Sequence, residues 1–449
     1  MHKTNTDHIL ILGMGITGLS LLNYLSKKNK TISVYDQNKS LDKLKEITKN
    51  YEVQNLYIGD VNKLIFNNIS SVAISPGVKL ESEVKEKLKK NHVEIINDLY
   101  LLAQEIEGSN IKLIGVTGTN GKTTTCSIIK FLLLQQGIKA EVVGNIGKPV
   151  LDILPIKNLD VLIIELSSFQ LEIESFLKFD VGITLNISED HLDRHNSFVD
   201  YIQAKKNLHK NSYKKIINYD DPNLHDWYDE HTASVSLSSN KKCPDYYLTY
   251  SSSKPFLKDK KGFELDLSES RLQGEHNLFN VMASIAAIRA IFLNFECKKI
   301  QLKNFCGIPH RLEWVRSLRG IDFYNDSKAT NIASTIAAVN SFSNKNIHLI
   351  MGGDSKKQSL APLKKILRQN IQSIALIGKD ATIFQAEFSS NESLSIKNCK
   401  VMDEAVKFLF SLAKENDIVL LSPACSSLDS YTDYKARGDD FKKNVNLLE

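Results

Sequence analysis

The stretch GVTGTNGKTTT, residues 115–125, has residue types that bind a nucleotide triphosphate. Its glycines allow backbone N–H groups to approach an anion closely, and a helix-like segment follows, whose N-terminus would attract negative charge. Lys122 would place a full positive charge beside the phosphates, and Thr123 a hydroxyl beside Mg²⁺. The strict pattern G-x-x-x-x-G-K-[ST] is not met, because Val116 stands where its first glycine would be. We therefore predict a relative of the phosphate-binding loop.

Acidic and histidine side chains follow two predicted strands. Glu165 ends the apolar run VLIIE, and Asp190, His191 and Asp193 come just after another such run. A carboxylate at the end of a buried strand is unfavourable unless something compensates it, and Mg²⁺ prefers carboxylate oxygens. The alternatives are helix N-caps for the two acids and a core position for the histidine. Their place beside a phosphate loop favours a metal site.

A second glycine-rich stretch, HILILGMGITGLS at residues 8–20, contains the dinucleotide-binding pattern G-x-G-x-x-G at Gly13, Gly15 and Gly18. Taken alone it would indicate an NAD-dependent oxidoreductase, but that function leaves the lysine-containing loop unexplained. A glycine turn and a helix N-terminus bind a pyrophosphate whatever is attached to it. The pattern therefore predicts a nucleotide site without naming the nucleotide.

These motifs stand between short apolar runs that alternate with amphipathic segments of helix length. Continuous apolar strands separated by helices are typical of parallel sheets covered on both faces, so we predict an α/β protein. The predicted strands are residues 8–12, 31–36, 71–75, 111–117, 161–166, 181–186, 215–218, 346–352, 373–378 and 417–422. A chain of 449 residues exceeds one core, and we expect three domains at residues 1–100, 101–307 and 308–449. The polar stretch 233–263 predicts short antiparallel strands and turns.

Composition excludes several classes of protein. The 57 basic and 52 acidic residues give a net charge of +5, which is too balanced to indicate nucleic-acid binding. The six cysteines form no C-x-x-C pair, so a zinc site or a disulfide framework is not expected. No apolar run approaches the roughly 18 residues of a membrane span, and the N-terminus lacks the pattern of a signal peptide. We expect a cytoplasmic protein.

Further motifs give the chain a family resemblance. In order they are GVTGTNGKTTT, GNIG (144–147), IELSSFQLE (164–172), NISEDHLDRH (186–195), HNLFN (276–280), GIPHRLE (307–313), NDSKATN (325–331), GGDSKK (352–357) and SPACSSLDSY (422–431). Together they resemble the Mur ligases over essentially the whole chain. IELSSFQLE and NDSKATN are most similar to the member that adds D-glutamate to UDP-N-acetylmuramoyl-L-alanine in peptidoglycan synthesis.

The resemblance implies a fold and a reaction. It implies a Rossmann-like UDP-sugar domain, a central P-loop-type ATPase domain and a Rossmann-like C-terminal domain that swings closed over the amino-acid site. ATP would phosphorylate the substrate carboxylate, and the D-glutamate amine would attack the acyl phosphate to give amide, ADP and phosphate. The partners would be the sugar nucleotide, D-glutamate and ATP, with no nucleic acid. Mg²⁺ would occupy two sites, and we expect a monomer.

The resemblance also assigns site residues, position by position. The catalytic residues would be Lys122, Asp190, His191 and Lys205. The ATP site would comprise Gly118, Thr119, Asn120, Gly121, Lys122, Thr123, Thr124, Asn277, Asn280, Arg311 and Asp326. The UDP-sugar site would comprise Gly15, Ile16, Thr17, Asp36, Ser75, Gly77 and Asn145. The D-glutamate site would comprise Lys328, Thr330, Lys356, Ser427, Leu428 and Tyr434, the last in place of the family's phenylalanine. The metal ligands would be Thr123, Glu165, His191 and Lys205.

Lys205 is implied as a ligand because the family carries a carbamylated lysine, and in YIQAKKN this lysine fits the register. Lys206 is adjacent and remains an alternative, as does an ordinary exposed helix lysine. Only the neutral amine reacts with CO₂, and burial lowers the pKa of a lysine. Two other functions stay open: a sibling ligase with another amino acid, and an inactive regulatory paralogue, although the retained Lys122, Glu165 and His191 argue against the latter.

Overall fold

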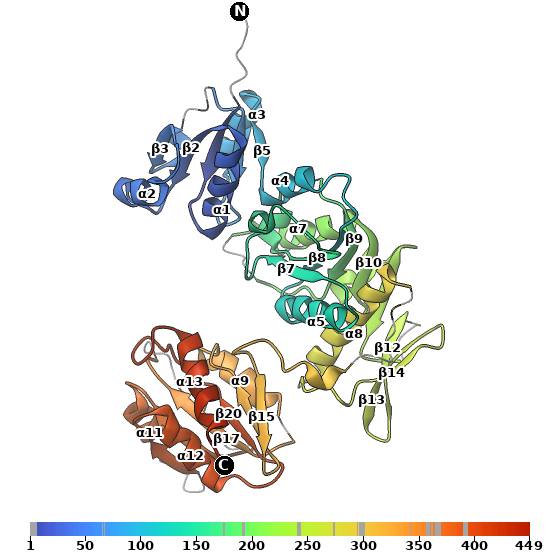
Figure 1. Cartoon of the computed structure of the whole chain (residues 1–449), viewed down its shortest axis with the longest axis vertical. Helices are drawn as coiled ribbons and strands as arrows, with labels where there is room; N and C mark the ends of the chain where they lie inside the picture. Colours follow the sequence, from blue (N-terminus) through green and yellow to red (C-terminus); the bar gives the residue numbers. More distant parts are fainter. Residues whose placement is uncertain are drawn as a thin grey trace, which may run out of the picture. The chain divides into compact units, whose positions relative to one another are not determined.

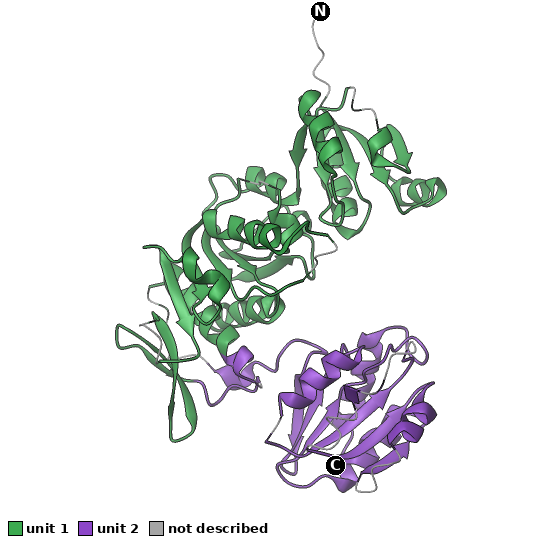
Figure 2. Cartoon of the chain, turned by 180° about the vertical axis from the view of Figure 1, so that it is seen from behind, with its two compact units in different colours: residues 1–266, 279–300 green, residues 267–278, 301–449 purple. Residues whose placement is uncertain are grey.

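The computed structural model describes residues 7–449 except 65, 67, 174–175, 191–193, 240–243, 273, 294, 296–300, 343, 356–359, 361, 364–369 and 389–393. The described chain forms two compact units (Figure 2). The first comprises residues 1–266 and 279–300, and the second residues 267–278 and 301–449. The division at residues 100 and 307 stays a prediction.

The first sheet of unit 1 is entirely parallel, with the order β3-β2-β1-β4-β5. Its strands are β1 His8–Leu12, β2 Thr31–Asp36, β3 Asn55–Ile58, β4 Ser71–Ile74 and β5 Glu94–Ile96. The accompanying helices are α1 Ile16–Leu25, α2 Leu41–Thr48, α3 Ser82–Lys90 and α4 Asp98–Glu105 (Figure 1). Because β1 is central, the glycine loop that follows it opens at the carboxyl edge of the sheet, where α/β proteins bind ligands.

The second sheet of unit 1 has the order β14-β13-β12-β11-β10-β9-β6-β8-β7. Its strands are β6 Lys112–Thr117, β7 Ala140–Gly144, β8 Val161–Glu165, β9 Phe179–Thr184, β10 Ser212–Asn218, β11 Thr232–Ser236, β12 Tyr246–Ser251, β13 Lys254–Asp259 and β14 Glu264–Asp266. The helices are α5 Lys122–Gln135, α6 Ser168–Leu171, α7 Phe198–Lys210 and α8 Glu275–Ile291. Strand β6 lies between β8 and β9, so the ends of these three strands meet.

The prediction for residues 233–263 is partly wrong. Strands β12, β13 and β14 are antiparallel as expected, but β11 runs parallel to β10 and to β12. The core explains the difference, because Val235 is fully buried and extends the apolar interior of the parallel sheet. Because the residues around Val235 are mostly polar, the sequence did not indicate that the parallel sheet continues here.

Unit 2 contains a six-stranded sheet with the order β15-β16-β20-β17-β18-β19, in which only β15 is antiparallel to its neighbour. Its strands are β15 Glu313–Leu318, β16 Ile321–Asn325, β17 Ile347–Gly352, β18 Ile371–Ile377, β19 Ser395–Asn398 and β20 Ile418–Leu421. Two apolar cores form with helices α9 Ile332–Asn340, α11 Ala381–Phe388, α12 Met402–Leu412 and α13 Tyr434–Asn446 (Figure 1). The three largely parallel sheets confirm the predicted α/β fold.

Within the described residues, no helix is both long enough and apolar enough to cross a membrane.

Candidate active site

The predicted phosphate loop connects β6 to α5. Gly118 and Gly121 have φ values of +151° and +85°, which L side chains rarely adopt. A Cβ on Gly121 would also lie 2.7 Å from Asn280 Oδ1. Gly121 and Asn280, both predicted to bind ATP, therefore meet at this turn. Asn186 fixes the loop: its carbonyl accepts from Thr119 N at 2.9 Å, and its Oδ1 accepts from the next backbone N–H at 2.8 Å. The loop is therefore preformed.

Lys122 lies at the first position of α5, and its ammonium faces the loop. Nζ donates to the carbonyl oxygens of Gly118 at 2.8 Å and Thr119 at 2.9 Å. Thr123 and Thr124 follow on the same helix and are partly exposed. A cation and a helix N-terminus thus face the same space, which is the arrangement that binds phosphate.

Glu165 ends β8 beside this loop, and its side chain is 1% exposed. Its Oε1 accepts from Asn145 Nδ2 at 3.0 Å, whereas its buried Oε2 has no hydrogen-bond partner among the described residues. A buried carboxylate oxygen without a partner is costly, and a divalent cation would compensate it. The residues present therefore fit a magnesium ion at this strand end. Thr123, the other predicted ligand, directly follows Lys122 in the sequence.

Replacing Glu165 by glutamine is expected to raise the Mg²⁺ concentration that half-saturates phosphate release by about 10–100-fold. The amide keeps the volume of the side chain but removes the negative charge that attracts the cation. A Mg²⁺ titration of phosphate release from ATP measures this. Glu141→Gln is the control, because Glu141 pairs with Lys130 outside the site. An unchanged Mg²⁺ requirement would refute the metal assignment.

The remaining predicted metal ligands differ in what the structure says of them. His191 and Asp193 lie outside the described residues, and among those described no group of three or more His, Cys, Asp or Glu could hold a metal. Asp190 is described and partly buried. The part of His191 in a metal site therefore stays a prediction.

Lys205, on α7, is 1% exposed and points at the phosphate loop. Its Nζ donates to Gly118 O at 2.9 Å and to Thr117 Oγ1 at 3.4 Å, and lies 4.6 Å from the centre of the Tyr201 ring. Burial and the nearby Lys122 ammonium lower the pKa of Lys205 to about 7, against the opposing effect of Asp190. The amine is therefore substantially neutral near pH 7.

The adjacent Lys206 faces elsewhere. Its Nζ lies 5.5 Å from the centre of the Trp227 ring, and its side chain is partly exposed. Of the two lysines, Lys205 is thus the one that contacts the phosphate loop.

In the N-terminal sheet, Asp36 holds the first glycine loop. Its Oδ2 accepts from Met14 N at 2.7 Å, its Oδ1 accepts from Asn38 N at 2.8 Å, and Lys39 Nζ lies 3.5 Å away. These hydrogen bonds lower the pKa of the Asp36 carboxyl despite its burial. Gly15 caps the start of α1, and Ile16 is 79% exposed in the turn.

The other residues predicted to bind the sugar nucleotide lie in α1 or follow strands of both sheets of unit 1. Thr17 lies in α1, Ser75 and Gly77 follow β4, and Asn145 follows β7. Ser75 N donates to Leu12 O at 2.9 Å, so the β4 loop lies against the end of β1. The structure thus brings this loop and the first glycine loop together.

In unit 2, Asp326 follows β16 and is buried. Its Oδ2 accepts from Ser422 Oγ at 2.9 Å, and its Oδ1 accepts from Leu312 N at 3.2 Å. Burial raises the pKa of Asp326 to about 7. Arg311 is exposed and its charge opposes this shift, and Asn277 is 7% exposed.

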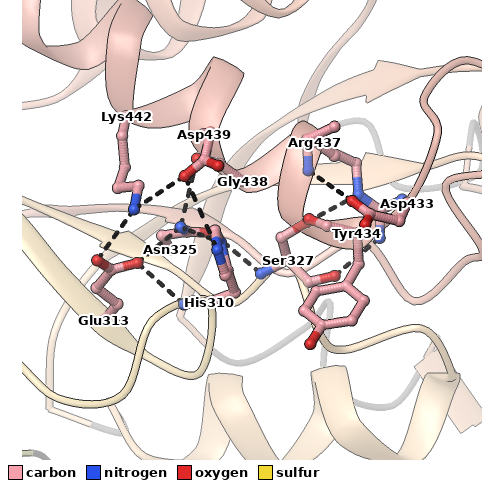
Figure 3. A network of polar contacts seen from close by, with 11 residues as sticks. His310, Glu313, Asn325, Ser327, Asp433, Tyr434, Arg437, Gly438, Asp439 and Lys442 are labelled. Carbon is pink, nitrogen blue, oxygen red and sulfur yellow. Dashed lines mark hydrogen bonds and ion pairs between the residues drawn. The ribbon is translucent and has the colours of Figure 1, made fainter. Parts of the chain in front are cut away.

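The residues predicted to bind D-glutamate gather at the carboxyl ends of β16 and β20 in unit 2. Lys328 Nζ lies 5.5 Å from the centre of the Tyr434 ring, and that ring meets His310 edge-on at 5.8 Å between centroids (Figure 3). Ser427 is buried and Leu428 is 70% exposed in the loop after β20, and Thr330 N donates to Lys328 O at 2.8 Å. Lys356 lies outside the described residues.

Arg437, on α13, joins these strand ends and was not singled out by the sequence. It is 1% exposed and donates to Ser327 O at 2.9 Å and to Ser327 Oγ at 3.0 Å (Figure 3). It also donates to Cys425 O at 3.1 Å. Burial lowers the pKa of Arg437 to about 10, which leaves it charged at neutral pH. The guanidinium therefore fixes the two loops that carry Lys328 and Ser427.

Arg437→Met is expected to lower the free energy of unfolding by about 3 kcal/mol, because buried carbonyl groups lose a charged donor. Thermal and urea unfolding measure this loss. Lys435→Met, on the exposed side of the same helix, is the control and should unfold like the unaltered protein. Equal stability of the two variants would contradict the role given to the guanidinium.

Other contacts in the site could not be recognised from residue type. Asn186 lies within the motif NISEDHLDRH, but only the structure shows its amide holding the phosphate loop. Tyr201 OH is hydrogen-bonded to Thr119 Oγ1 at 2.8 Å across 82 residues of sequence. In the segment YIQAK, Tyr201 stands four residues before Lys205. This spacing was the only sequence signal that the two residues share a helix face.

Three models of known families match the chain. The family described as "Mur ligase MurD-like, N-terminal domain" matches residues 7–97, "Mur ligase middle domain" matches residues 116–288, and "Mur ligase, glutamate ligase domain" matches residues 310–425.

Individual relatives match over nearly the whole chain. A UDP-N-acetylmuramoylalanine–D-glutamate ligase of Nitrosomonas europaea is 37% identical over 98% of this chain and 96% of its own. One of Coxiella burnetii is 34% identical over 98% of both chains.

Among solved structures, a UDP-N-acetylmuramoyl-L-alanyl-D-glutamate–2,6-diaminopimelate ligase has a TM-score of 0.61 at 19% identity, covering 99% of this chain and 93% of its own. The UDP-N-acetylmuramate–alanine ligase of Thermotoga maritima has a TM-score of 0.56 at 17% identity, covering 98% and 99%. These two structures share the fold, and the full-length sequence similarity shows that the chain belongs to the Mur ligase family.

Proposed function

We propose that the chain is an ATP-dependent ligase that joins D-glutamate to UDP-N-acetylmuramoyl-L-alanine, a step of peptidoglycan synthesis. The observation that carries the proposal is the full-length similarity to relatives named for this reaction. The preformed phosphate loop supports it, because that loop binds the nucleotide the reaction consumes.

In the first step, the carboxylate of the L-alanyl group attacks the γ-phosphorus of ATP, forming an acyl phosphate and releasing ADP. Lys122 would exchange its present carbonyl partners for a phosphate oxygen and stabilise the charge that develops there. Glu165 and Thr123 would hold Mg²⁺, which supplies charge neutralisation and polarises phosphoryl oxygens when bound. His191 and Asp190 are proposed to serve a second metal site nearer the acyl phosphate.

In the second step, the D-glutamate amine attacks the acyl carbon, phosphate leaves, and the amine proton passes to solvent. Both reactants are anionic, so cations must neutralise their approach. Lys328, whose Nζ lies against the Tyr434 ring, would do this for a carboxylate of D-glutamate. Ser427 is proposed to bind the same amino acid, and Lys356 is proposed as a second cation.

Lys205 is proposed to carry a carbamate. Its neutral amine would attack CO₂, forming an N–C bond and losing one proton to solvent, which leaves an anionic group beside the phosphate loop. The burial of Lys205 and its pKa of about 7 support this, because a protonated lysine cannot react. Such an anion would suit a cation at the same place.

The remaining parts of the proposal follow from the family. The N-terminal sheet would bind the uridine diphosphate group on the two loops that meet after β1 and β4, and Asn145 would contact the muramoyl group. The proposal also includes three domains, divided near residues 100 and 307, of which the C-terminal one closes over the amino-acid site. It further includes a cytoplasmic location and a monomeric state.

An amino-acid panel tests the proposed specificity. The purified protein, ATP, Mg²⁺ and UDP-N-acetylmuramoyl-L-alanine are supplied with D-glutamate, L-glutamate, L-lysine or meso-diaminopimelate, and the amide product is weighed by mass spectrometry. We expect a product with D-glutamate only. A product with another amino acid would assign the chain to a sibling step, and no product with any would favour a regulatory paralogue.

A further inference from the structure

His195 is a buried histidine that is not among the residues assigned above to the ATP and substrate sites, although it lines the same cavity as Ser75. It is 3% exposed, its Nε2 is hydrogen-bonded to Ser168 Oγ at 2.9 Å, and its Nδ1 lies 3.0 Å from Glu172 Oε1. Its ring stacks on Phe169 with centroids 5.4 Å apart and meets Tyr201 edge-on at 5.2 Å. The imidazole thus has a hydroxyl at Nε2, a carboxylate near Nδ1 and an aromatic ring stacked on one face.

Serine, histidine and glutamate in this order form the arrangement of a hydrolytic triad, but access argues against hydrolysis. A cavity of about 730 Å³ is lined by Phe169, Glu172 and His195 but not by Ser168. Ser168 is 3% exposed, so its hydroxyl cannot reach a carbonyl carbon in that cavity. The arrangement therefore fixes an imidazole and does not create a nucleophile.

The two residues that His195 joins belong to the two sides of the ATP site. Ser168 begins α6, three residues after Glu165 at the end of β8. Tyr201 is on α7, where its ring lies under Lys205 Nζ and its hydroxyl is bonded to Thr119 of the phosphate loop. The imidazole is thus the packed connection between a carboxylate-bearing strand end and a lysine-bearing helix.

The other side of the imidazole is fixed as well. Arg194 contacts two neighbours of the imidazole: its Nη2 lies 3.7 Å from Glu172 Oε2, and its guanidinium carbon lies 5.1 Å from the centre of the Phe169 ring. The same Nη2 donates to Val78 O at 2.7 Å. Val78 follows the β4 loop that carries Ser75 and Gly77. This chain of contacts ties His195 to the loop on which the sugar nucleotide is proposed to bind.

We propose that His195 is a positioning residue for the ligase reaction, acting through Ser168 on one side and Tyr201 on the other. By holding β8 and α7 at a fixed separation, it places Glu165 and Lys205 around the γ-phosphate. The inference rests on the proposed function, since the phosphoryl step is what this placement serves. Because His195 is proposed to act through these two neighbours, its loss should lower kcat more than it raises the KM for ATP.

The test measures steady-state phosphate release with ATP, the sugar nucleotide and D-glutamate in two His195 variants, one His209 control, Tyr201→Phe and the double variant of His195→Phe with Tyr201→Phe. His195→Phe keeps an aromatic ring but removes both nitrogens, and His195→Gln keeps a polar group that can reach Ser168. His209→Phe is the matched control, because His209 is also buried on this side of unit 1 and packs edge-on against Trp227.

We expect His195→Phe to lower kcat at least about tenfold while the KM for ATP changes less than about threefold. His195→Gln should recover part of the kcat, and the losses caused by His195→Phe and Tyr201→Phe should not multiply in the double variant. His209→Phe should retain kcat even where its melting temperature falls equally.

Three results would overturn the inference: an unchanged kcat in His195→Phe, an equal loss in His209→Phe, or fully multiplicative losses with Tyr201→Phe. Each kcat is expressed as a ratio to the kcat of the unaltered protein, measured with the amino acid that the unaltered protein accepts. If the unaltered protein releases no phosphate with any amino acid, the proposed function fails, and this outcome is distinct from a failure of the inference.

Discussion

Lys122→Ala is expected to lower kcat for phosphate release by about 10²–10³-fold. The reason is that the ammonium already faces the phosphate loop, held by the Gly118 and Thr119 carbonyls, and the reaction develops negative charge there. Alanine favours the helix, so α5 should form unchanged. Stopped-time phosphate assays with saturating substrates measure the loss.

The control for this prediction is Lys130→Ala. Lys130 lies on the same helix and pairs with Glu141 on the surface, at 2.6 Å between Nζ and Oε1. It should retain the full rate. If Lys122→Ala also retained most of its activity, the phosphate loop would not be the catalytic ATP site.

The second large effect is expected at Lys205, whose replacement by alanine should lower kcat by about 10²-fold or more, since the carbamate that would hold a cation beside the transferred phosphoryl group is lost. Lys206→Ala is the matched control, because Lys206 is adjacent in sequence but contacts Trp227. It should retain the rate of the unaltered protein. The reverse result would move the carbamate to Lys206.

Carbon dioxide separates a carbamate from a lysine that acts as an amine. The unaltered protein should lose activity after exhaustive removal of CO₂ and recover it when bicarbonate is added. With a pKa of about 7, Lys205 is mostly protonated at pH 6 and mostly neutral at pH 8. At equal dissolved CO₂, recovery should therefore be faster at pH 8. Full activity without CO₂ would exclude the carbamate.

The sequence predicted the parts of the site that lie within one continuous segment. The loop of residues 115–125 could be recognised because strand, glycines, lysine and helix follow one another, and a phosphate site needs all four together. Glu165 could be placed because a carboxylate ending an apolar strand must meet a compensating group. The structure adds that its Oε2 is the buried atom without a hydrogen-bond partner in the described part of the chain.

Strands were predictable where they were apolar throughout. Strands β3 and β19 were missed because each is a short edge strand with mostly exposed or partly exposed residues, so neither shows an apolar run. Strand β16 was missed because Asp322 and Asn325 interrupt its apolar letters, although the sheet buries its centre.

Contacts between distant segments could not be predicted from residue type. An arginine in YKARGDD suggests an exposed helix, and only the fold shows Arg437 buried among backbone carbonyls. Asp36 is predicted to lie at the nucleotide, and only the structure shows that its carboxylate accepts from the backbone of the glycine loop. The choice between Lys205 and Lys206 likewise depended on which face of α7 meets the phosphate loop.

The most direct test of the account follows oxygen from substrate to phosphate. UDP-N-acetylmuramoyl-L-alanine labelled with ¹⁸O in both carboxylate oxygens is incubated with the protein, ATP, Mg²⁺ and D-glutamate. An acyl phosphate predicts one ¹⁸O in each released phosphate, with the other retained in the new amide. Phosphate free of ¹⁸O, released while amide forms, would contradict phosphorylation of the carboxylate and with it the role given to this site.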